Sequence, residues 1–492
     1  MNLDLLVIAL YMLGMIGIGF WAKSRARTQS DFLVAGRRLG PVFYAGTLAA
    51  LVMGGGATLG GIGLGYQNGL SGVWLVFAMS GGVAAISLVL APLINRLRVY
   101  TVSQMLELRY GPIGTRVSGL VMMAYTLMIS VTSTIAYGAI FSVLFDIPKV
   151  PAILLGSSVV VVYSVLGGMW SITYTDMVQF FLKTLSIFFI LLPMALLKAG
   201  GLDGLQAALA PEFFDWTSIG AGKIFNYILL YVPTMVIGQD LWQRVFTARS
   251  DGVARWAGLV AAGYGFAYGL AGALIGMSAR VLLPGLQGRD AVYTMTVREL
   301  LPAGLAGLVV AGALSAIMST SSGCLIATAT VAKEDVQGKR RTEVDAHDEL
   351  RSSRIYIVIF GIVMATIACL VRDVVTALTI ASDILVGGLM VAVLGGIVWK
   401  RGTGRGAIAS IVAGMAGTLG TMAVLGDIDR NEVIYVGLAA SLATYVIVSL
   451  VDKPTPAAVV ARWNERVRRP RVAAESARVA DAPLATMERA SP

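Results

Sequence analysis

The chain has 492 residues, of which 57% are hydrophobic and 13% are charged, and its formal net charge is +10. A soluble chain carries roughly 25% charged residues, so this composition excludes an ordinary soluble protein and favours one whose surface faces lipid. The Lys and Arg residues lie between apolar runs and near the C-terminus, which argues against the folded basic face of a nucleic-acid-binding protein.

The apolar runs have the length of membrane-spanning helices. Roughly 20 apolar residues cross the ~30 Å hydrocarbon core, and only helices satisfy the backbone of such segments in lipid. The first run lacks a basic start and a small-residue cleavage site, so we expect a retained helix rather than a signal peptide. In chain order the sequence predicts about thirteen helices, at about residues 3–22, 41–65, 72–95, 117–142, 149–170, 177–198, 224–244, 256–282, 301–331, 353–371, 374–399, 405–426 and 433–451.

Positive charge alternates between the loops. The loops after the first, third, seventh, ninth and eleventh runs are rich in Lys and Arg, whereas the intervening loops are poorer, and residues 66–72 carry no charge. Cytoplasmic loops hold an excess of Lys and Arg. We therefore expect a multi-pass protein of a bacterial-type inner membrane, with its N-terminus outside and its C-terminus in the cytoplasm.

The composition changes after residue 451. Five arginines between Arg462 and Arg471 precede an Ala-rich stretch that runs to residue 492. We expect residues 1–451 to form a single transmembrane domain and residues 452–492 to form a cytoplasmic tail, first basic and amphipathic on the leaflet, then disordered. A charge cluster that only sets topology is the alternative.

The second predicted helix is interrupted by glycine. Residues 51–61 read Leu-Val-Met-Gly-Gly-Gly-Ala-Thr-Leu-Gly-Gly, and each glycine costs ~1 kcal/mol of helix stability relative to alanine. Broken helices persist in membranes where the freed carbonyl groups line a cavity or bind an ion. Close packing through small residues is the alternative, but a glycine triplet exceeds what packing needs.

The seventh predicted helix carries polar and helix-breaking residues, namely Tyr231, Pro233, Thr234, Gly238, Gln239 and Asp240. Pro233 removes a backbone donor and frees a carbonyl group, and an interrupted helix at the corresponding place in a second half indicates a binding site. Residues 41–198 and 224–399 would then be two five-helix repeats. Because five is odd, the second repeat enters the membrane inverted, and extra helices lie at both ends.

Four consecutive hydroxyl residues, 319–322, lie in the apolar ninth run. Their oxygen atoms are hard, neutral ligands of the kind that hard cations accept. Ala316, Ser319 and Thr320 are three and four residues apart, so they share one face of the helix. Hydrogen bonding back to their own helix is the alternative role for these hydroxyls.

Three segments carry a resemblance to a known family. They read Gly-Arg-Arg-Leu-Gly-Pro at 36–41, Gly-Gly-Met-Trp-Ser-Ile-Thr-Tyr-Thr-Asp-Met-Val-Gln at 167–179, and Ala-Ile-Met-Ser-Thr at 316–320. Their order and spacing are similar to those of sodium:solute symporters, the family that includes proline, pantothenate, sialic-acid and sugar symporters. The resemblance covers about residues 1–450 and implies an all-α, LeuT-like core of five-plus-five inverted-repeat helices.

The resemblance also implies a sodium site between the second and ninth helices. Its ligands would be the carbonyl groups of Ala50, Met53 and Ala316 and the hydroxyl groups of Ser319 and Thr320. Asp176 matches a family carboxylate and would assist sodium entry or release, with a simple interfacial acid as the alternative. Na⁺ would be the coupling ion and no other cofactor is implied. The site would offer neutral oxygens and no proton acceptor, which favours sodium over a proton.

The class of solute is left open. Val52 stands where proline symporters have an acidic residue. Asp383 lies about ten residues into the eleventh run, without Lys or Arg among residues 378–384, and a carboxylate at the membrane centre costs at least ~2.5 kcal/mol and marks a functional site. We expect it to hold a positively charged nitrogen of the solute; a second sodium ion or a position near the outer interface is the alternative. The predicted substrate-binding residues are Gly54, Gly55, Gly56, Thr58, Tyr231, Thr234 and Asp383.

The predicted function is therefore a sodium-coupled secondary symporter that imports a small organic solute, with a zwitterionic or amine-bearing solute favoured. A carboxylate or sugar symporter and a proton-coupled transporter remain alternatives. A membrane sensor on the same scaffold would need a further regulatory domain. The expected partners are the solute, Na⁺ and the lipid bilayer, without nucleic acid or an obligate protein partner.

An enzyme is not expected. The one histidine, His347, lies in a charged loop, and the sequence has no clustered histidines, paired carboxylates or exposed nucleophile. Cys324 and Cys369 lie inside apolar runs, so neither a disulfide nor a Cys/His metal site is predicted.

Overall fold

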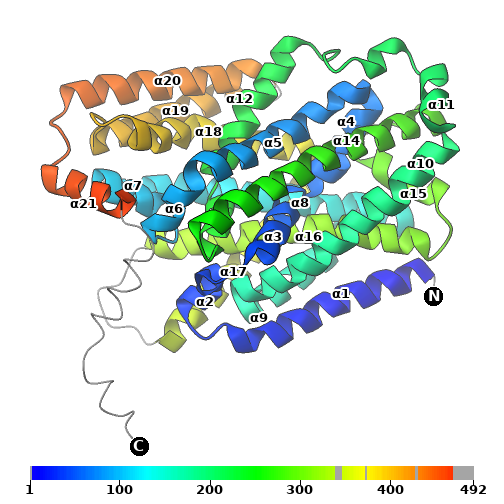
Figure 1. The fold of residues 1–492 in the computed structure, drawn as a ribbon, viewed down its shortest axis with the longest axis horizontal. Helices are drawn as coiled ribbons and strands as arrows, with labels where there is room; N and C mark the ends of the chain where they lie inside the picture. The colour runs from blue at the N-terminus through cyan, green and yellow to red at the C-terminus, as the bar shows by residue number, and fades with distance from the viewer. Residues whose placement is uncertain (1–2, 113, 338–345, 372–373, 427–429, 469–492) are drawn as a thin grey trace, which may run out of the picture.

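The computed structural model describes residues 3–112, 114–337, 346–371, 374–426 and 430–468. Over these residues the fold is all-helical apart from one isolated bridge between Leu39 and Ala248, which confirms the predicted fold class. Figure 1 shows long helices that run side by side along the longest axis, with α1 along one edge of the bundle and α19 and α20 along the opposite edge.

The helices follow one another with short connections. They are α1 (Leu3–Ala22), η1 (Lys23–Arg25), α2 (Gln29–Val34), η2 (Ala35–Arg37), α3 (Pro41–Val52), η3 (Gly56–Gly60), α4 (Gly61–Asn68), η4 (Gly69–Val73), α5 (Trp74–Ala85), η5 (Ile86–Leu90), α6 (Ala91–Leu97), α7 (Val102–Tyr110), α8 (Thr115–Phe145), α9 (Lys149–Thr184), η6 (Leu185–Leu191), α10 (Leu192–Lys198), α11 (Gly201–Ala208), η7 (Pro211–Phe214), α12 (Ala221–Ile237), α13 (Gln239–Thr247), η8 (Val253–Ala257), α14 (Gly258–Leu282), α15 (Ala291–Leu300), α16 (Leu305–Val331), η9 (Ala332–Gln337), α17 (Ala346–Leu370), α18 (Val374–Val398), α19 (Gly404–Leu425), α20 (Asn431–Val451) and α21 (Ala457–Arg468).

Among the described residues, ten helices are long and apolar enough to cross a membrane, or eleven when α12 and α13 count as one bent span. Two of these helical stretches, Gly56–Leu97 and Lys149–Lys198, hold 42 and 50 residues. At 1.5 Å per residue each is much longer than the ~30 Å hydrocarbon core. The chain turns within them at Gly69 and Gly168, whose φ angles are 60° and 54°. The finer count of thirteen stays a prediction.

Gly168 shows why one of these turns needs glycine. Its positive φ angle lies in the region that L side chains avoid, and a Cβ atom there would lie 2.5 Å from the carbonyl oxygen of Phe32. The turn divides α9 into two limbs, close to the boundary that the hydrophobic pattern predicted. The second limb carries Asp176 and Lys183 into the centre of the bundle.

The centre of the bundle is α16. Every residue in its most apolar window is buried, whereas only about a third or less of the corresponding window is buried in α1, α17, α19 and α20. These outer helices therefore present their remaining surface to lipid, as the predicted integral membrane fold requires. Small residues let neighbours approach α16 closely, since a Cβ atom on Gly312 would lie 2.1 Å from Ser186 Oγ.

The predicted interruption of the second apolar run is present. Helix α3 ends at Val52, Met53 has non-helical angles (φ −86°, ψ 61°), and helical structure resumes at Gly56. A Cβ atom on Gly54 would lie 2.2 Å from Thr320 Oγ1. Glycine at this position is thus what allows the broken segment to contact α16.

The predicted interruption of the seventh run lies at its glycine rather than at its proline. Pro233 is accommodated inside α12, and the break comes at Gly238 (φ −62°, ψ 131°), where α12 and α13 meet at a bend of 44°. Membrane helices tolerate proline where neighbouring groups satisfy the freed carbonyl. The bend at Gly238 places the first turn of α13, with Asp240, beside α8.

The start of the C-terminal tail packs against the bundle. Helix α21 contacts α6 and α7, Trp463 is buried, and Arg466 Nη1 donates to the carbonyl oxygen of Leu97 at 3.1 Å. Its cytoplasmic position and the two-repeat division of the chain stay predictions. The Ala-rich stretch 469–492, the loop 338–345 and the side chain of His347 lie outside the described residues.

Candidate functional site

The break in α3 and the hydroxyl-bearing face of α16 form one site. Ser319 Oγ donates to the carbonyl oxygen of Ala50 at 2.8 Å, and Thr320 Oγ1 donates to that of Leu51. Both hydroxyl oxygens also lie within hydrogen-bond distance of the carbonyl oxygen of Ala316, at 3.0 and 3.4 Å. Four of the five predicted sodium ligands, Ala50, Ala316, Ser319 and Thr320, therefore lie together.

The side chain of Lys183 joins this site from the second limb of α9. Its Nζ atom donates to the carbonyl oxygens of Ala49 at 3.0 Å, Ala50 at 3.0 Å and Met53 at 3.2 Å, and the residue is fully buried. An ammonium group has three donors, and the last carbonyl groups of a helix lack intrahelical partners and carry partial negative charge. The broken end of α3 thus holds a cation supplied by the protein itself.

We tested whether the same residues fit a sodium ion. The carbonyl groups of Ala50 and Met53, both predicted sodium ligands, already accept hydrogen bonds from the Lys183 ammonium. A sodium ion on these oxygens would lie close to the ammonium nitrogen, and two like charges about 4 Å apart repel by about 4 kcal/mol at an effective dielectric constant of about 20. The donor set fits one cation, and in this arrangement Lys183 provides it.

Sequence reasoning missed Lys183, although a signal was available. It is a basic residue seven positions into the apolar run 177–198, and an ionisable residue within a membrane helix is a functional candidate by default. The site is therefore not made of neutral oxygens alone, because the Lys183 ammonium group lies among them.

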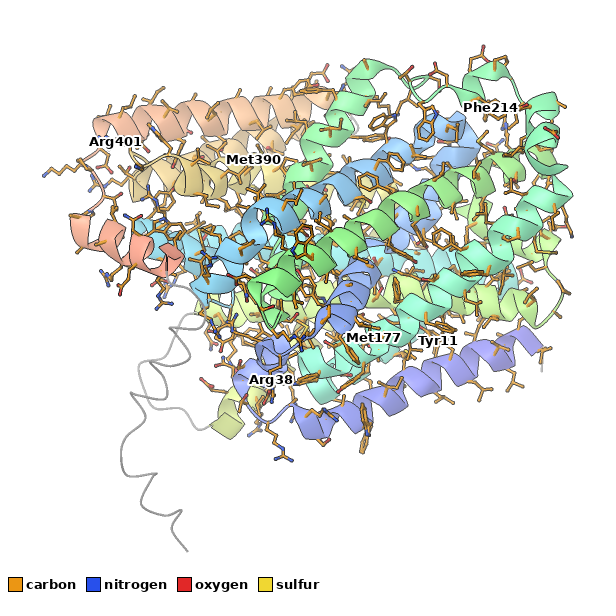
Figure 2. All side chains as sticks on the ribbon, in the orientation of Figure 1. Tyr11, Arg38, Met177, Phe214, Met390 and Arg401 are labelled. Carbon is orange, nitrogen blue, oxygen red and sulfur yellow. The ribbon has the colours of Figure 1, made fainter. Side chains whose placement is uncertain are left out.

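Support for the site comes from α1 and the first limb of α9. Ser315 Oγ donates to the hydroxyl oxygen of Tyr11, labelled in Figure 2 on α1, at 3.0 Å. Tyr163 donates to the carbonyl oxygen of Met318 at 3.0 Å. On the other side of the site, a Cβ atom on Gly46 would lie 2.5 Å from the sulfur of Met177, so α3 and α9 pack in close contact there. These contacts hold α16 and α3 in register.

Asp176 is part of a buried ion pair. Its Oδ2 atom lies 2.9 Å from Arg244 Nη2 and accepts a hydrogen bond from Thr47, and the side chains of Asp176 and Arg244 are at most 1% exposed. The pair connects α3, α9 and α13. The alternative of a simple interfacial acid does not fit this burial. Asp176 also lies seven residues before Lys183, two turns away on the same face of α9, and its role in an ion pathway stays a prediction.

A small cavity lies next to the break in α3. Its volume is about 30 Å³, enough for roughly two water molecules at about 10–15 Å³ each, so an organic solute requires helix movement to enter. The cavity is lined by Leu51, Val52, Gly54, Gly56, Ala57, Met79, Tyr125, Ile129, Thr132, Ser133, Met235, Asp240, Leu241, Thr320 and Leu378.

The predicted substrate-binding residues divide into two groups. Gly54 and Gly56 line the cavity, whereas the other five do not. Gly55 lies against α8, and Asp383 is buried in α18. The hydroxyl oxygen of Thr58 lies 2.8 Å from that of Tyr268, and the hydroxyl oxygen of Tyr231 lies 3.2 Å from that of Thr379. The hydroxyl group of Thr234 donates to the carbonyl oxygen of Leu230.

Asp383 was predicted to lack a partner within the protein. In the structure Asp383 is 2% exposed and interacts with other groups of the protein. The premise was therefore wrong, because a buried carboxylate is retained where other groups compensate its charge. A role for Asp383 in solute binding stays a prediction.

Asp240 is a polar residue of the seventh run that was not among the predicted substrate-binding residues. It is 5% exposed, lines the cavity, and accepts a hydrogen bond from the hydroxyl group of Tyr125 at 3.1 Å. It stands in the first turn of α13, where the positive end of the helix dipole stabilises a carboxylate. Its position two residues after Gly238, in the interrupted seventh run, was the available signal.

Comparison with known proteins places this geometry in a family. The sequence profile described as "Sodium:solute symporter family" matches residues 32–414. The sodium/proline symporter of Staphylococcus aureus is 24% identical over 486 residues, which cover 91% of this chain and 93% of that protein. The corresponding protein of strain USA300 / TCH1516 is 25% identical over 487 residues, with the same shares covered.

Solved structures share the fold. A Na⁺-coupled sialic acid symporter in a substrate-bound, outward-open state superposes with a TM-score of 0.81 at 17% identity, covering 93% of this chain and 99% of that one. Mhp1, a nucleobase-cation-symport-1 family transporter in a closed conformation with bromovinylhydantoin bound, gives a TM-score of 0.56 at 13% identity, covering 89% and 98%. Because the family profile matches well over half of the sequence, this chain belongs to the sodium:solute symporter family.

Proposed function

We propose that this chain is a secondary active symporter that imports a small organic solute across a bacterial inner membrane, driven by a cation at the contact of α3 with α16. The observation that carries the proposal is the broken end of α3, whose carbonyl groups converge with Ser319 on one cationic site beside a cavity. Binding at a broken helix near the centre of the bundle is typical of secondary transporters.

Family membership and the Na⁺-coupled structural relative support sodium-coupled symport as the general activity. The oxygens of Ala50, Met53, Ala316, Ser319 and Thr320 are the proposed cation site. Asp176, paired with Arg244, is the proposed pathway residue toward the cytoplasm. No catalytic step is proposed for the chain, and its multi-pass helices make the lipid bilayer its environment.

The conformational step follows from the small volume of the cavity. About 30 Å³ does not admit an organic solute, so the helices around it must separate first toward one side and then toward the other. We propose that residues 41–198 and 224–399 form the two inverted five-helix repeats that make this movement. Alternating access of this kind moves one bundle against the other around a central site.

Among solutes, one with a positively charged nitrogen is favoured. Asp240 places a carboxylate at the cavity wall, with Tyr125 as its hydrogen-bond donor, and a buried carboxylate gains most from a cationic partner. We propose a zwitterionic or amine-bearing solute, held between Asp240 and the glycine-lined break at Gly54 and Gly56. The named substrates of the relatives, proline and sialic acid, are both carboxylates, and only proline is a zwitterion.

Uptake in proteoliposomes tests the function. The purified chain is reconstituted and offered a panel of radiolabelled amino acids, amines, carboxylates and sugars under an inward sodium gradient, an inward proton gradient, or neither. We expect one solute to accumulate above its external concentration under a cation gradient and to leak back after an ionophore. If no solute accumulates under any gradient, while a relative with the same protocol does transport, the proposal is refuted.

A further inference from the structure

We propose that the ammonium group of Lys183 takes the place of the coupling sodium ion in this chain, so that its transport is independent of sodium. This inference rests on the proposed symport function and concerns the ion that is coupled to it. It departs from the expectation that the relatives support, and it does so because of contacts made by this chain's own residues.

The first step is the geometry of the cation. The Nζ atom of Lys183 donates to three carbonyl oxygens, those of Ala49, Ala50 and Met53, at 3.0 to 3.2 Å. These use all three donors of an ammonium group. The same carbonyl oxygen of Ala50 also accepts from Ser319. The charged nitrogen thus lies among the oxygens that would otherwise ligate a metal cation, and it connects α9 with the broken end of α3.

The second step is that the ammonium group and a sodium ion compete for the same oxygens. A sodium ion on the carbonyl oxygens of Ala50 and Met53 would lie close to the charged nitrogen of Lys183, and the two like charges would repel each other. The ammonium group therefore excludes sodium from the broken end of α3.

The third step concerns the groups around the amine. The carbonyl and hydroxyl groups that α3 and α16 present to it are neutral. The charged pair Asp176 and Arg244 lies two turns away along α9 and carries no net charge, so it neither replaces nor cancels the ammonium. The ring of Tyr268 from α14 lies 5.9 Å from Nζ. The titratable and charged groups that surround the site on the packed elements are Tyr11, Asp176, Arg244, Tyr264 and Tyr268.

Sodium alone is the probe for the first measurement. We expect the melting temperature of the purified wild-type chain to be the same in NaCl as in choline chloride at equal ionic strength. In Lys183→Ala the carbonyl oxygens lose their ammonium partner, and we expect NaCl to raise the melting temperature by about 2 °C or more relative to choline chloride. Lys198→Ala is the matched control, because Lys198 also donates to a backbone carbonyl, that of Leu300, but away from α3.

Wild-type stabilisation by sodium would overturn the inference, whatever the variants do. If Lys183→Ala does not yield folded protein, the wild-type comparison still decides, and Lys183→Met supplies a variant of similar volume. Sodium stabilisation of Lys198→Ala equal to that of Lys183→Ala would also overturn the inference, since the effect would not come from the α3 site.

The ion requirement of uptake is the second measurement. Proteoliposomes receive radiolabelled L-proline and then the rest of the panel, in a sodium salt or in the potassium salt of the same anion. We expect the rate of solute uptake to be the same in the two salts. Uptake that requires sodium overturns the inference and leaves the symport function standing, whereas absence of all uptake refutes the symport function itself.

Discussion

The buried pair of Asp176 and Arg244 allows a sharp test of how the centre of the bundle is held together. The two side chains are at most 1% exposed and their charged atoms are 2.9 Å apart. Replacing Arg244 with methionine keeps much of the side-chain length and leaves the Asp176 carboxylate without its cation. Removal of one partner of a buried ion pair costs about 3–5 kcal/mol.

The neighbouring contacts set the size of the expected effect. Thr47 still donates to Asp176 after the change, and Arg244 also loses a contact from Nη1 to the sulfur of Met169 at 2.9 Å. We therefore expect Arg244→Met to lower the free energy of unfolding by about 3 kcal/mol, near the lower end of the range for a broken buried ion pair. Combining it with Asp176→Asn removes the uncompensated charge, and residues in direct contact show interaction energies of about 0.5–3 kcal/mol.

Thermal unfolding of the detergent-purified protein measures the stability of the wild type, the two single variants and the double variant, which together form a double-mutant cycle. The double variant should be more stable than Arg244→Met alone, by at least about 1 kcal/mol, because asparagine carries no charge to bury. If the two single losses simply add in the double variant, the pair does not interact as the structure indicates and the reasoning fails.

Three further predictions concern the break, the cavity and the topology. Gly54→Ala should abolish transport, because the new Cβ atom would lie 2.2 Å from Thr320 Oγ1. Gly81→Ala is the control and should transport normally, because the nearest atom to its new Cβ atom is 3.9 Å away. Equal uptake by both variants would contradict the proposed contact. Asp240→Asn should raise the KM for a cationic or zwitterionic solute about tenfold or more without changing the coupling ion, since a hydrogen bond to a charged group contributes about 1.5–3 kcal/mol; an unchanged KM removes Asp240 from the solute site. Asn68→Cys should react with an impermeant maleimide from the outside of intact cells, and labelling only in inverted vesicles would reverse the topology.

The class of fold and the position of its main irregularity follow from local features of the sequence. Length and hydrophobicity define a membrane-spanning helix because lipid leaves the backbone no other partner. Glycine clustering predicted the break that follows Val52 for a local reason, since each glycine weakens a helix wherever it lies. The helical spacing of Ala316, Ser319 and Thr320 likewise placed their oxygens on one face before any contact was known.

The tertiary structure decided which groups meet. Lys183 lies 130 residues or more from the carbonyl groups that it contacts, and no local pattern states that α9 brings its ammonium to the end of α3. In the sequence, Asp383 and Asp240 are alike, since each is a carboxylate within an apolar run. In the structure, Asp240 follows the bend at Gly238 and lines the cavity, whereas Asp383 on α18 does not line it. Helix packing decides which charged side chain lies at the cation site, and packing is a property of the whole bundle.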